Sequence, residues 1–251
     1  MTAVPAWPPR STPRLFVEAP LAAGPLTITG PQAHYLLTVM RAKPGDAVKL
    51  FDDATGEWLG VVASVAKRDL KLDVTERLRE REPVPDLWLC AAPLKKGRVD
   101  WVAEKACELG VARLKPVLTR RAVVDKLNGD RLRAHMIEAA EQCGRTALPA
   151  LDEPVRLEAL IRDWPERTLF FADEQGGAPI AEAMRAQPGP AAILIGPEGG
   201  FDDAEREAIR RVPRAVPIAL GPRILRADTA AAAALAVWMA VTGDWATPPG
   251  P

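Results

Sequence analysis

The spacing of hydrophobic residues divides the chain into two stretches with different periods. Before residue 80, short alternating or β-branched runs are separated by turn residues, which is typical of β-strands. Three such runs predict strands over residues 46–53, 57–66 and 70–78. We therefore expect a small β-rich domain in residues 1–80, followed by a charged linker that contains prolines.

One short helix is predicted within this first domain, over residues 30–42. His34 and Arg41 are seven residues apart, so they lie on nearly the same helical face. The apolar residues between them cover the opposite, buried face. An exposed polar pair of this kind either contacts RNA or is simply solvated.

From residue 87 onward, strand-like and helix-like stretches alternate. The strands are predicted over residues 87–93, 112–118, 168–173, 191–196 and 215–221, and the helices over 97–110, 129–145, 180–186, 202–211 and 228–243. This alternation predicts an α/β domain over residues 85–251 with a mostly parallel sheet, and strands that are apolar on both faces fit helices on both sides. Ligands of such sheets bind beyond the carboxyl ends of the strands, at loops 171–177, 196–201 and 221–228.

Composition narrows the class of protein. The 251 residues are 48% hydrophobic and 26% charged, which suffices for a packed core. No apolar run reaches the roughly 18 residues of a membrane-spanning helix, and no apolar stretch marks a signal peptide. Three widely spaced cysteines form neither a disulfide framework nor a zinc motif. We expect a cytoplasmic location, no membrane association and no metal.

The net charge is zero, but the charges are unevenly distributed. Residues 95–133 contain 11 Lys and Arg against 5 Asp and Glu, whereas residues 152–182 contain 3 against 8. This segregation is compatible with a side that faces a polyanion. Two ordinary solvated surfaces explain it equally well.

The sequence Gly-Pro-Glu-Gly-Gly at residues 196–200 forms a strand-to-helix turn of unusual chemistry. Glycine-rich turns of this kind commonly bind phosphate, but Glu198 would repel a phosphate and no lysine follows to meet one. Asp202 and Glu205 form a predicted capping box at the start of the next helix. The loop therefore favours a neutral or cationic ligand held by backbone groups, or it is a tight turn whose glutamate faces water.

The loop at residues 221–228 repeats this pattern, because Gly221-Pro222 is followed by the charged Arg223. Asp228 or Thr229 is predicted to cap the next helix, which contains five consecutive alanines at residues 230–234. Side chains this small allow another segment or another subunit to approach the helix closely. A plain buried helix is the alternative.

The two loop motifs together resemble a known family. Leu-Ile-Gly-Pro-Glu-Gly-Gly-Phe at 194–201 and Leu-Gly-Pro-Arg-Ile-Leu-Arg-Ala-Asp-Thr-Ala at 220–230 are similar to motifs of the ribosomal RNA small subunit methyltransferase E family, which belongs to the knotted SPOUT methyltransferases. Residues 34–52, 95–111 and 138–145 agree in the same order, so the resemblance covers nearly the whole chain.

The resemblance implies both architecture and chemistry. It implies an N-terminal PUA-like β-barrel, a C-terminal α/β domain with a deep trefoil knot, and a homodimer. It also implies S-adenosylmethionine as methyl donor and N3 of one uridine in 16S ribosomal RNA of the small subunit as acceptor. The donor is a sulfonium cation without phosphate, which explains why a carboxylate is tolerated in the loop.

Site residues follow from the same resemblance. The cofactor site would consist of Phe171, Ala172, Gly196, Glu198, Gly199, Gly200, Leu220, Gly221, Ile224, Leu225 and Ala230. Arg223 and Arg226 would stabilise negative charge on the uracil oxygens, and Asp228 or Glu198 would accept the N3 proton. RNA would contact Arg10, Arg14, His34, Arg41, Lys95, Lys96, Arg98, Arg120, Arg121 and Arg145.

The sequence departs from the family pattern at one place. Where the family usually has Arg-Thr-Glu-Thr-Ala, residues 226–230 read Arg-Ala-Asp-Thr-Ala. The acid at position 228 is one methylene shorter, which questions any catalytic role that needs the reach of a glutamate.

Two other functions remain open at this point. One is a SPOUT enzyme that methylates the ribose 2′-oxygen of RNA. The other is an RNA-binding protein of the same fold without catalysis, although the intact glycine loops argue against it.

Overall fold

The computed structural model describes residues 12–18, 20–95, 97–124 and 126–246, and they form two compact units. The first unit contains residues up to Pro83 together with Ala140–Ala147. The second unit contains Val84–Ala139 and the described chain from Leu148 to Ala246. No pattern in the sequence predicts that Ala140–Ala147 return to the first unit. Within the described residues, no helix is long and apolar enough to cross a membrane.

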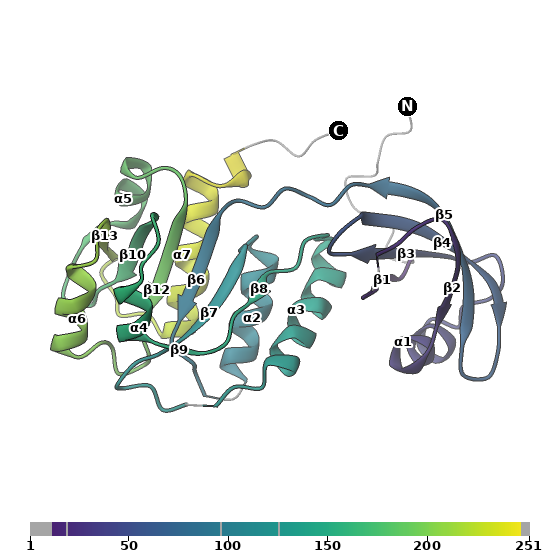
Figure 1. The fold of residues 1–251 in the computed structure, drawn as a ribbon, viewed down its shortest axis with the longest axis horizontal. Coiled ribbons are helices and arrows are strands. Elements are labelled where there is room, and N and C mark those ends of the chain that lie inside the picture. The colour runs from purple at the N-terminus through teal and green to yellow at the C-terminus, as the bar shows by residue number, and fades with distance from the viewer. Residues whose placement is uncertain (1–11, 19, 96, 125, 247–251) are drawn as a thin grey trace. The chain divides into compact units, whose positions relative to one another are not determined.

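The first unit is built on a five-stranded sheet with the strand order β1-β3-β4-β5-β2 (Figure 1). The strands are β1 (Arg14–Phe16), β2 (Gly24–Ile28), β3 (Ala47–Asp52), β4 (Gly56–Val65) and β5 (Leu70–Arg79). β1 pairs with β3 in parallel, and the other pairs are antiparallel. The three predicted strands are confirmed as β3, β4 and β5. β1 and β2 were not predicted because they are short and the sequence around them is rich in proline and glycine.

The predicted helix of the first unit is irregular. It begins as α1 (Gly30–His34) and continues as a π-helical turn, η1 (Tyr35–Val39). Arg41 then adopts a left-handed conformation with a φ of 54°. His34 and Arg41 are both exposed, as expected, but the wider π turn means that they do not share a regular helical face. Leu36 is fully buried and anchors this segment on the sheet.

The second unit contains a parallel sheet with the order β11-β13-β10-β12-β6-β7-β8, and β9 also pairs with β7. Its strands are β6 (Leu87–Ala91), β7 (Arg113–Leu118), β8 (Ala150–Leu151), β9 (Val155–Arg156), β10 (Thr168–Ala172), β11 (Ala178–Pro179), β12 (Ala191–Ile195) and β13 (Ala215–Ala219). All of these pairs are parallel. The five strands expected from the sequence are confirmed, and the additional three have only two residues each.

Helices cover both faces of this sheet, as the apolar strands predict (Figure 1). They are α2 (Arg98–Glu108), α3 (Gly129–Cys143), α4 (Leu157–Arg162), α5 (Ile180–Ala186), α6 (Asp203–Arg210) and α7 (Ala227–Val241), with a 3-10 turn, η2, at Asp244–Ala246. Leu169 and Phe171 of β10 pack in one core cluster with residues of α4 and α6. Phe170 lies between them in the strand and is equally buried, so it points to the opposite face.

Candidate active site

Three loops leave neighbouring strands at the same edge of the parallel sheet. The first loop (Asp173–Gly177) follows β10, the second loop (Gly196–Asp202) follows β12, and the third loop (Leu220–Arg226) follows β13. β12, β10 and β13 are adjacent and parallel, so the loops lie side by side. The edge is the carboxyl end of the sheet, where ligands of such folds bind.

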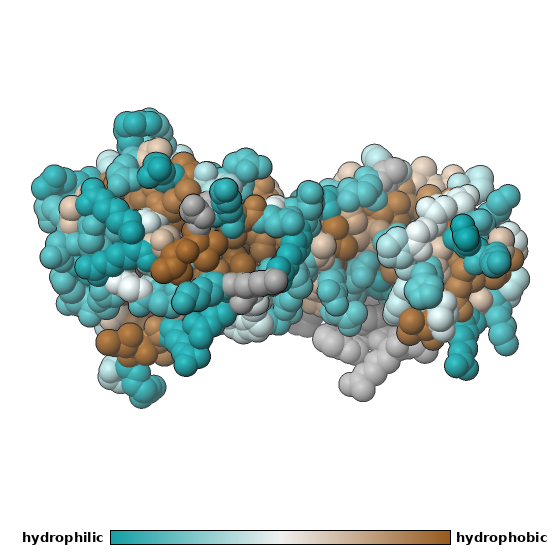
Figure 2. Space-filling view, turned by 90° about the horizontal axis from the view of Figure 1, so that it is seen from below, coloured by the Kyte–Doolittle hydropathy of each residue, from teal (hydrophilic) through white to brown (hydrophobic). Residues whose placement is uncertain are grey.

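The surface around this edge is partly apolar. The arrowhead of β6 points downward in Figure 1, so the view from below in Figure 2 faces the carboxyl ends of the strands. Apolar residues gather near the middle of that face of the second unit and are surrounded by hydrophilic ones. Val123 and Ile224, in loops that follow strands, are 63% and 92% exposed.

Two glycines of the second loop, Gly196 and Gly200, lie in tight surroundings within the protein. A Cβ atom on Gly196 would lie 3.1 Å from the ring of Phe201. One on Gly200 would lie 2.4 Å from the Glu174 carboxylate, and Gly200 also has a φ of +66°. The predicted capping box is confirmed, because Asp202 accepts the Glu205 N–H and Glu205 accepts the Asp202 N–H. The loop is thus a turn held by internal contacts, and it is exposed at Glu198 and Gly199.

The third loop offers free backbone groups. Gly221 has a φ of +95° and open space where a Cβ would be. Within the described part of the chain, no backbone hydrogen bond involves Gly221–Leu225. Such amide and carbonyl groups suit a ligand with both donors and acceptors, such as an adenine ring. The residues present therefore fit S-adenosylmethionine, and neighbouring carboxylates suit its positive charge.

The predicted cofactor residues differ in what they can offer. Phe171 is fully buried in the core, so only its backbone is available at the strand end. Ala172, Leu220 and Leu225 are half-buried, and Ala230 is buried in the first part of α7. Glu198 and Gly199 are exposed, as are Gly221 and Ile224.

Arg98 brings the two predicted catalytic acids together. Its Nη1 lies 3.4 Å from Oε1 of Glu198, and its Nε lies 3.7 Å from Oδ2 of Asp228. Arg98 begins α2, the element after β6, Glu198 lies in the second loop after β12, and Asp228 lies in the first turn of α7 after β13. We expected Arg98 to contact RNA, but the structure groups it with the candidate acids. The adjacency of β6 and β12 places Arg98 beside Glu198, and knowledge of it would have predicted this grouping. The sequence alone does not give the strand order on which that adjacency depends.

The start of α7 differs from the prediction. The N-cap residue is Arg226 rather than Asp228 or Thr229, so the predicted cap is wrong. Asp228 is the second helical residue, and its carboxylate accepts the N–H of Thr229 at 2.8 Å. An acid in the first turn still interacts favourably with the helix dipole. Arg223 and Arg226 are both exposed on the third loop.

Two of the predicted RNA contacts are buried instead. The Arg14 side chain is 6% exposed, pairs with Glu57 and donates to the carbonyl oxygens of Ala140 and Arg145. Burial lowers the pKa of Arg14, although the Glu57 carboxylate opposes this shift. The side chain of Arg145 is 5% exposed and lies 3.6 Å from Glu82. Neither guanidinium can reach a phosphate, so the expectation of RNA contact is wrong for both.

Two other predicted RNA contacts hold the second loop. Arg120 binds Asp202 at 3.0 Å, and Arg121 donates to the carbonyl oxygen of Gly199 at 2.8 Å. The pKa of Asp202 is lowered, first by the hydrogen bond from the Glu205 backbone and also by Arg120. Lys95 is exposed, and Arg10 and Lys96 lie outside the described residues.

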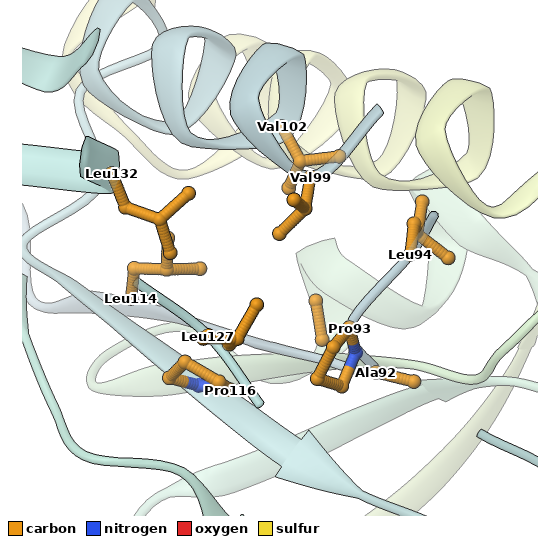
Figure 3. A pocket seen from close by; sticks show the side chains of 10 residues that line it. Ala92, Pro93, Leu94, Val99, Val102, Leu114, Pro116, Leu127 and Leu132 are labelled. Carbon is orange, nitrogen blue, oxygen red and sulfur yellow. The ribbon is translucent and has the colours of Figure 1, made fainter. Parts of the chain in front are cut away.

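A hollow lies next to the second loop, between β6, β7, α2 and α3 (Figure 3). Its empty volume is about 300 Å³, including open solvent at its mouth. The lining residues are Ala91, Ala92, Pro93, Leu94, Val99, Val102, Leu114, Pro116, Leu127 and Leu132. Ala92 donates its N–H to Ile195, the residue before Gly196. The lining side chains are all apolar, and none of the predicted cofactor residues is among them.

Comparison with known proteins identifies the family of the chain. Residues 80–239 match a family model described as an RNA methyltransferase domain, and residues 28–75 match an RNA methyltransferase PUA domain. The chain is 30% identical to ribosomal RNA small subunit methyltransferase E of Bacillus subtilis (strain 168), over 87% of this chain and 90% of that protein. It is 29% identical to the protein of the same name from Rickettsia conorii, over 81% and 84%.

Solved structures extend the likeness to three dimensions. The protein Lpg2936 of Legionella pneumophila, solved in complex with the bound cofactor SAM, superposes with a TM-score of 0.81 at 29% identity and covers 92% of this chain and 98% of that one. A ribosomal RNA small subunit methyltransferase E from Neisseria gonorrhoeae has the same fold, with a TM-score of 0.83 at 24% identity over 93% and 99%. The chain therefore belongs to the ribosomal RNA small subunit methyltransferase E family, with an α/β RNA methyltransferase domain and a PUA-like domain.

Proposed function

We propose that this enzyme transfers the methyl group of S-adenosylmethionine to N3 of one uridine in the 16S ribosomal RNA of the small subunit. The observation that carries the proposal is Arg98, whose guanidinium contacts Glu198 and Asp228 at 3.4 and 3.7 Å. A cation between two carboxylates, beside a loop of free backbone amides, provides groups for both proton removal and charge stabilisation. Family membership supports the same substrate.

The three loops would hold the cofactor. Backbone groups of Gly221–Leu225 would bind the adenine, while Ala172 and the second loop would line the remaining part of the site. When bound, the cofactor supplies an electrophilic methyl group on a sulfonium. Glu198 carries a negative charge close to the loop, which favours a cation over a phosphate.

The protein's task in the reaction is to orient and activate N3. The N3 atom carries a proton, and its loss leaves negative charge shared with the uracil oxygens. A carboxylate of Asp228 or Glu198 accepts this proton. Arg98 joins Arg223 and Arg226 as a third cation positioned to stabilise the resulting charge. The shorter Asp228 lies 3.7 Å from Nε of Arg98, so a glutamate is not needed for this contact.

RNA would be bound by the exposed cations among the predicted residues. Without the buried Arg14 and Arg145, and with Arg98 assigned to the candidate acids, the described candidates are His34, Arg41, Lys95, Arg120 and Arg121. Arg120 and Arg121 also anchor the second loop, so their substitution would affect both RNA and cofactor. Phosphate contacts of this kind give salt-dependent affinity rather than sequence choice.

We also infer a trefoil knot, a closed barrel in the first unit, and a homodimer. The path of the chain supports the knot, because α7 follows β13 near one end of the sheet and returns to pack on α2 and on β12 and β6 near its middle. The alanine-rich α7 and the exposed Ile224 support a subunit contact near the site. Sedimentation that shows only a 27.1 kDa species at micromolar concentration would contradict the dimer. A cytoplasmic location suits this substrate.

The test is methyl transfer from labelled S-adenosylmethionine to small ribosomal subunits that lack the modification and to naked 16S RNA. Mass spectrometry of the digested nucleosides identifies the product. We expect N3-methyluridine, and the preferred substrate shows whether assembly creates the target. Label on a ribose would favour the 2′-oxygen enzyme. Absence of cofactor binding would overturn the enzymatic proposal.

A further inference from the structure

Arg206 of α6 bonds through every nitrogen of its side chain, and two of these nitrogens reach the first and second loops. Its Nε lies 3.1 Å from Oδ1 of Asp173, and its Nη2 lies 2.9 Å from Oε1 of Glu174, both in the first loop. The same Nη2 donates to the carbonyl oxygen of Phe201 in the second loop at 3.3 Å. Nη1 lies 2.9 Å from Oδ1 of Asp203 at the start of α6. One guanidinium thus bonds to both loops at once.

The two central side chains of this cluster, Asp173 and Arg206, are buried. The side chains of Asp173 and Arg206 are 1% and 5% exposed. A buried ion pair depends on good geometry and further hydrogen bonds, because both charges have lost water. Asp173 meets this condition: it also accepts the N–H of Gln175 at 3.0 Å and a bond from Arg210 at 2.7 Å. The first loop is therefore fixed at its base rather than resting loosely on the surface.

The two loops also touch directly at a glycine. The Glu174 carboxylate occupies the space that a Cβ on Gly200 would need, at 2.4 Å. Arg206 holds Glu174 in this place through the bond to Oε1. One chain of contacts, from Arg206 to Glu174 to Gly200, therefore joins the two loops.

We propose that Arg206 is a positioning residue for the cofactor, which fixes the spacing between the first and second loops. This inference rests on the proposed function, in which both loops line the S-adenosylmethionine site. Arg206 need not touch the cofactor. Its guanidinium sets the distance between backbone groups that do, and preorganised groups bind without the cost of ordering the loops.

Other arginines of α6 do not share this role. Arg210 contacts the first loop through Asp173 alone, and its side chain is 42% exposed. Arg211 pairs only with Glu207 one turn away in the same helix, and its side chain is 75% exposed. Arg211 is therefore a matched control in the same helix and with the same side chain.

The decisive variant is Arg206→Lys, compared with Arg211→Lys. A lysine keeps the charge but cannot reproduce the planar set of bonds to four partners. For Arg206→Lys we expect the dissociation constant of S-adenosylmethionine, measured by calorimetry, to rise about tenfold or more. The KM for the cofactor should rise in parallel, while the KM for RNA and the kcat at saturating cofactor should stay within about twofold of the wild type. Arg211→Lys should change none of these.

A thermal melt establishes first that each variant is folded at the assay temperature. Should Arg206→Lys fail to fold, Glu174→Ala takes its place, because its side chain is 45% exposed and its loss leaves the Asp173 pair intact. We expect a threefold or larger rise in the cofactor dissociation constant for Glu174→Ala. A folded variant that binds the cofactor as tightly as the wild type overturns the role of Arg206. Failure of the wild type to bind the cofactor overturns the proposed function instead.

Discussion

Substitution of Arg98 by methionine separates a structural role from a catalytic one. Methionine keeps much of the length of the side chain but removes its charge, so Glu198 and Asp228 lose their shared partner. Two unit charges 3.4 Å apart interact by about 1 kcal/mol in water and about 5 kcal/mol at an effective dielectric constant of 20. The side chains of Arg98 and Glu198 are 39% and 34% exposed, so water screens the pair. Its contribution to folding is therefore about 1 kcal/mol or less.

The expected loss in catalysis is much larger. A preorganised group that stabilises charge developing in the transition state is typically worth about 3 to 4 kcal/mol, or about 10² to 10³ in kcat. We therefore expect Arg98→Met to melt within about 4 °C of the wild type while its kcat falls at least a hundredfold. Single-turnover methyl transfer at saturating cofactor and RNA measures the chemical step.

Two further variants identify the cause of any loss. Arg98→Lys keeps the charge and should retain more activity than Arg98→Met. Lys95→Met removes an exposed cation nearby in the sequence and should raise only the KM for RNA. The catalytic assignment is refuted if Arg98→Met keeps its kcat within about threefold and only its KM for RNA rises, because that pattern describes a phosphate contact.

Three other outcomes are expected. Arg223→Ala and Arg226→Ala should each lower kcat in the same assay, and unchanged turnover in both folded variants would remove these residues from the reaction. Burial alone would raise the pKa of Glu57, but the hydrogen bond and charge of Arg14 lower this pKa overall. The ionised carboxylate therefore stabilises the fold at pH values above 4.5, the ordinary pKa of a glutamate, and this contribution is lost as the pH falls below 4.5. Glu57→Gln should therefore lose about 3 kcal/mol of stability at pH 7, measured by urea unfolding, and show a weaker pH dependence below 4.5 than the wild type. Of the three thiols, only the exposed Cys143 should react with a thiol reagent in the native protein, since Cys90 and Cys107 are buried. Burial also raises the pKa of Cys90 to about 12. More than one modified thiol per native chain would contradict this burial.

The α/β domain could be predicted from the sequence because its elements are long and strongly patterned. Strands such as β12 are continuous apolar runs, and helices such as α6 carry their own capping box. The two-residue strands β8, β9 and β11 have no pattern of their own, since pairing with a longer neighbour defines them.

The site was only partly predictable for a different reason. The three loops are recognisable because glycine and proline interrupt the sequence after each strand. The roles of single arginines are not recognisable, since Arg14, Arg98 and Arg121 look alike in the sequence. The structure shows one buried against Glu57, one between two carboxylates and one on a loop carbonyl. Only the partners distinguish them, and each partner is distant along the chain.

The return of Ala140–Ala147 to the first unit has a consequence for synthesis on the ribosome. Arg14 donates to the carbonyl oxygens of Ala140 and Arg145, and Glu82 accepts the N–H of Thr146. Sixty-four residues separate Pro83 from Ala147. At typical rates of elongation, the nascent first unit must wait about 3 to 13 seconds for its last segment. During that interval Arg14 is a charged group without its carbonyl partners. The first unit therefore completes its fold only after translation has passed well into the second unit.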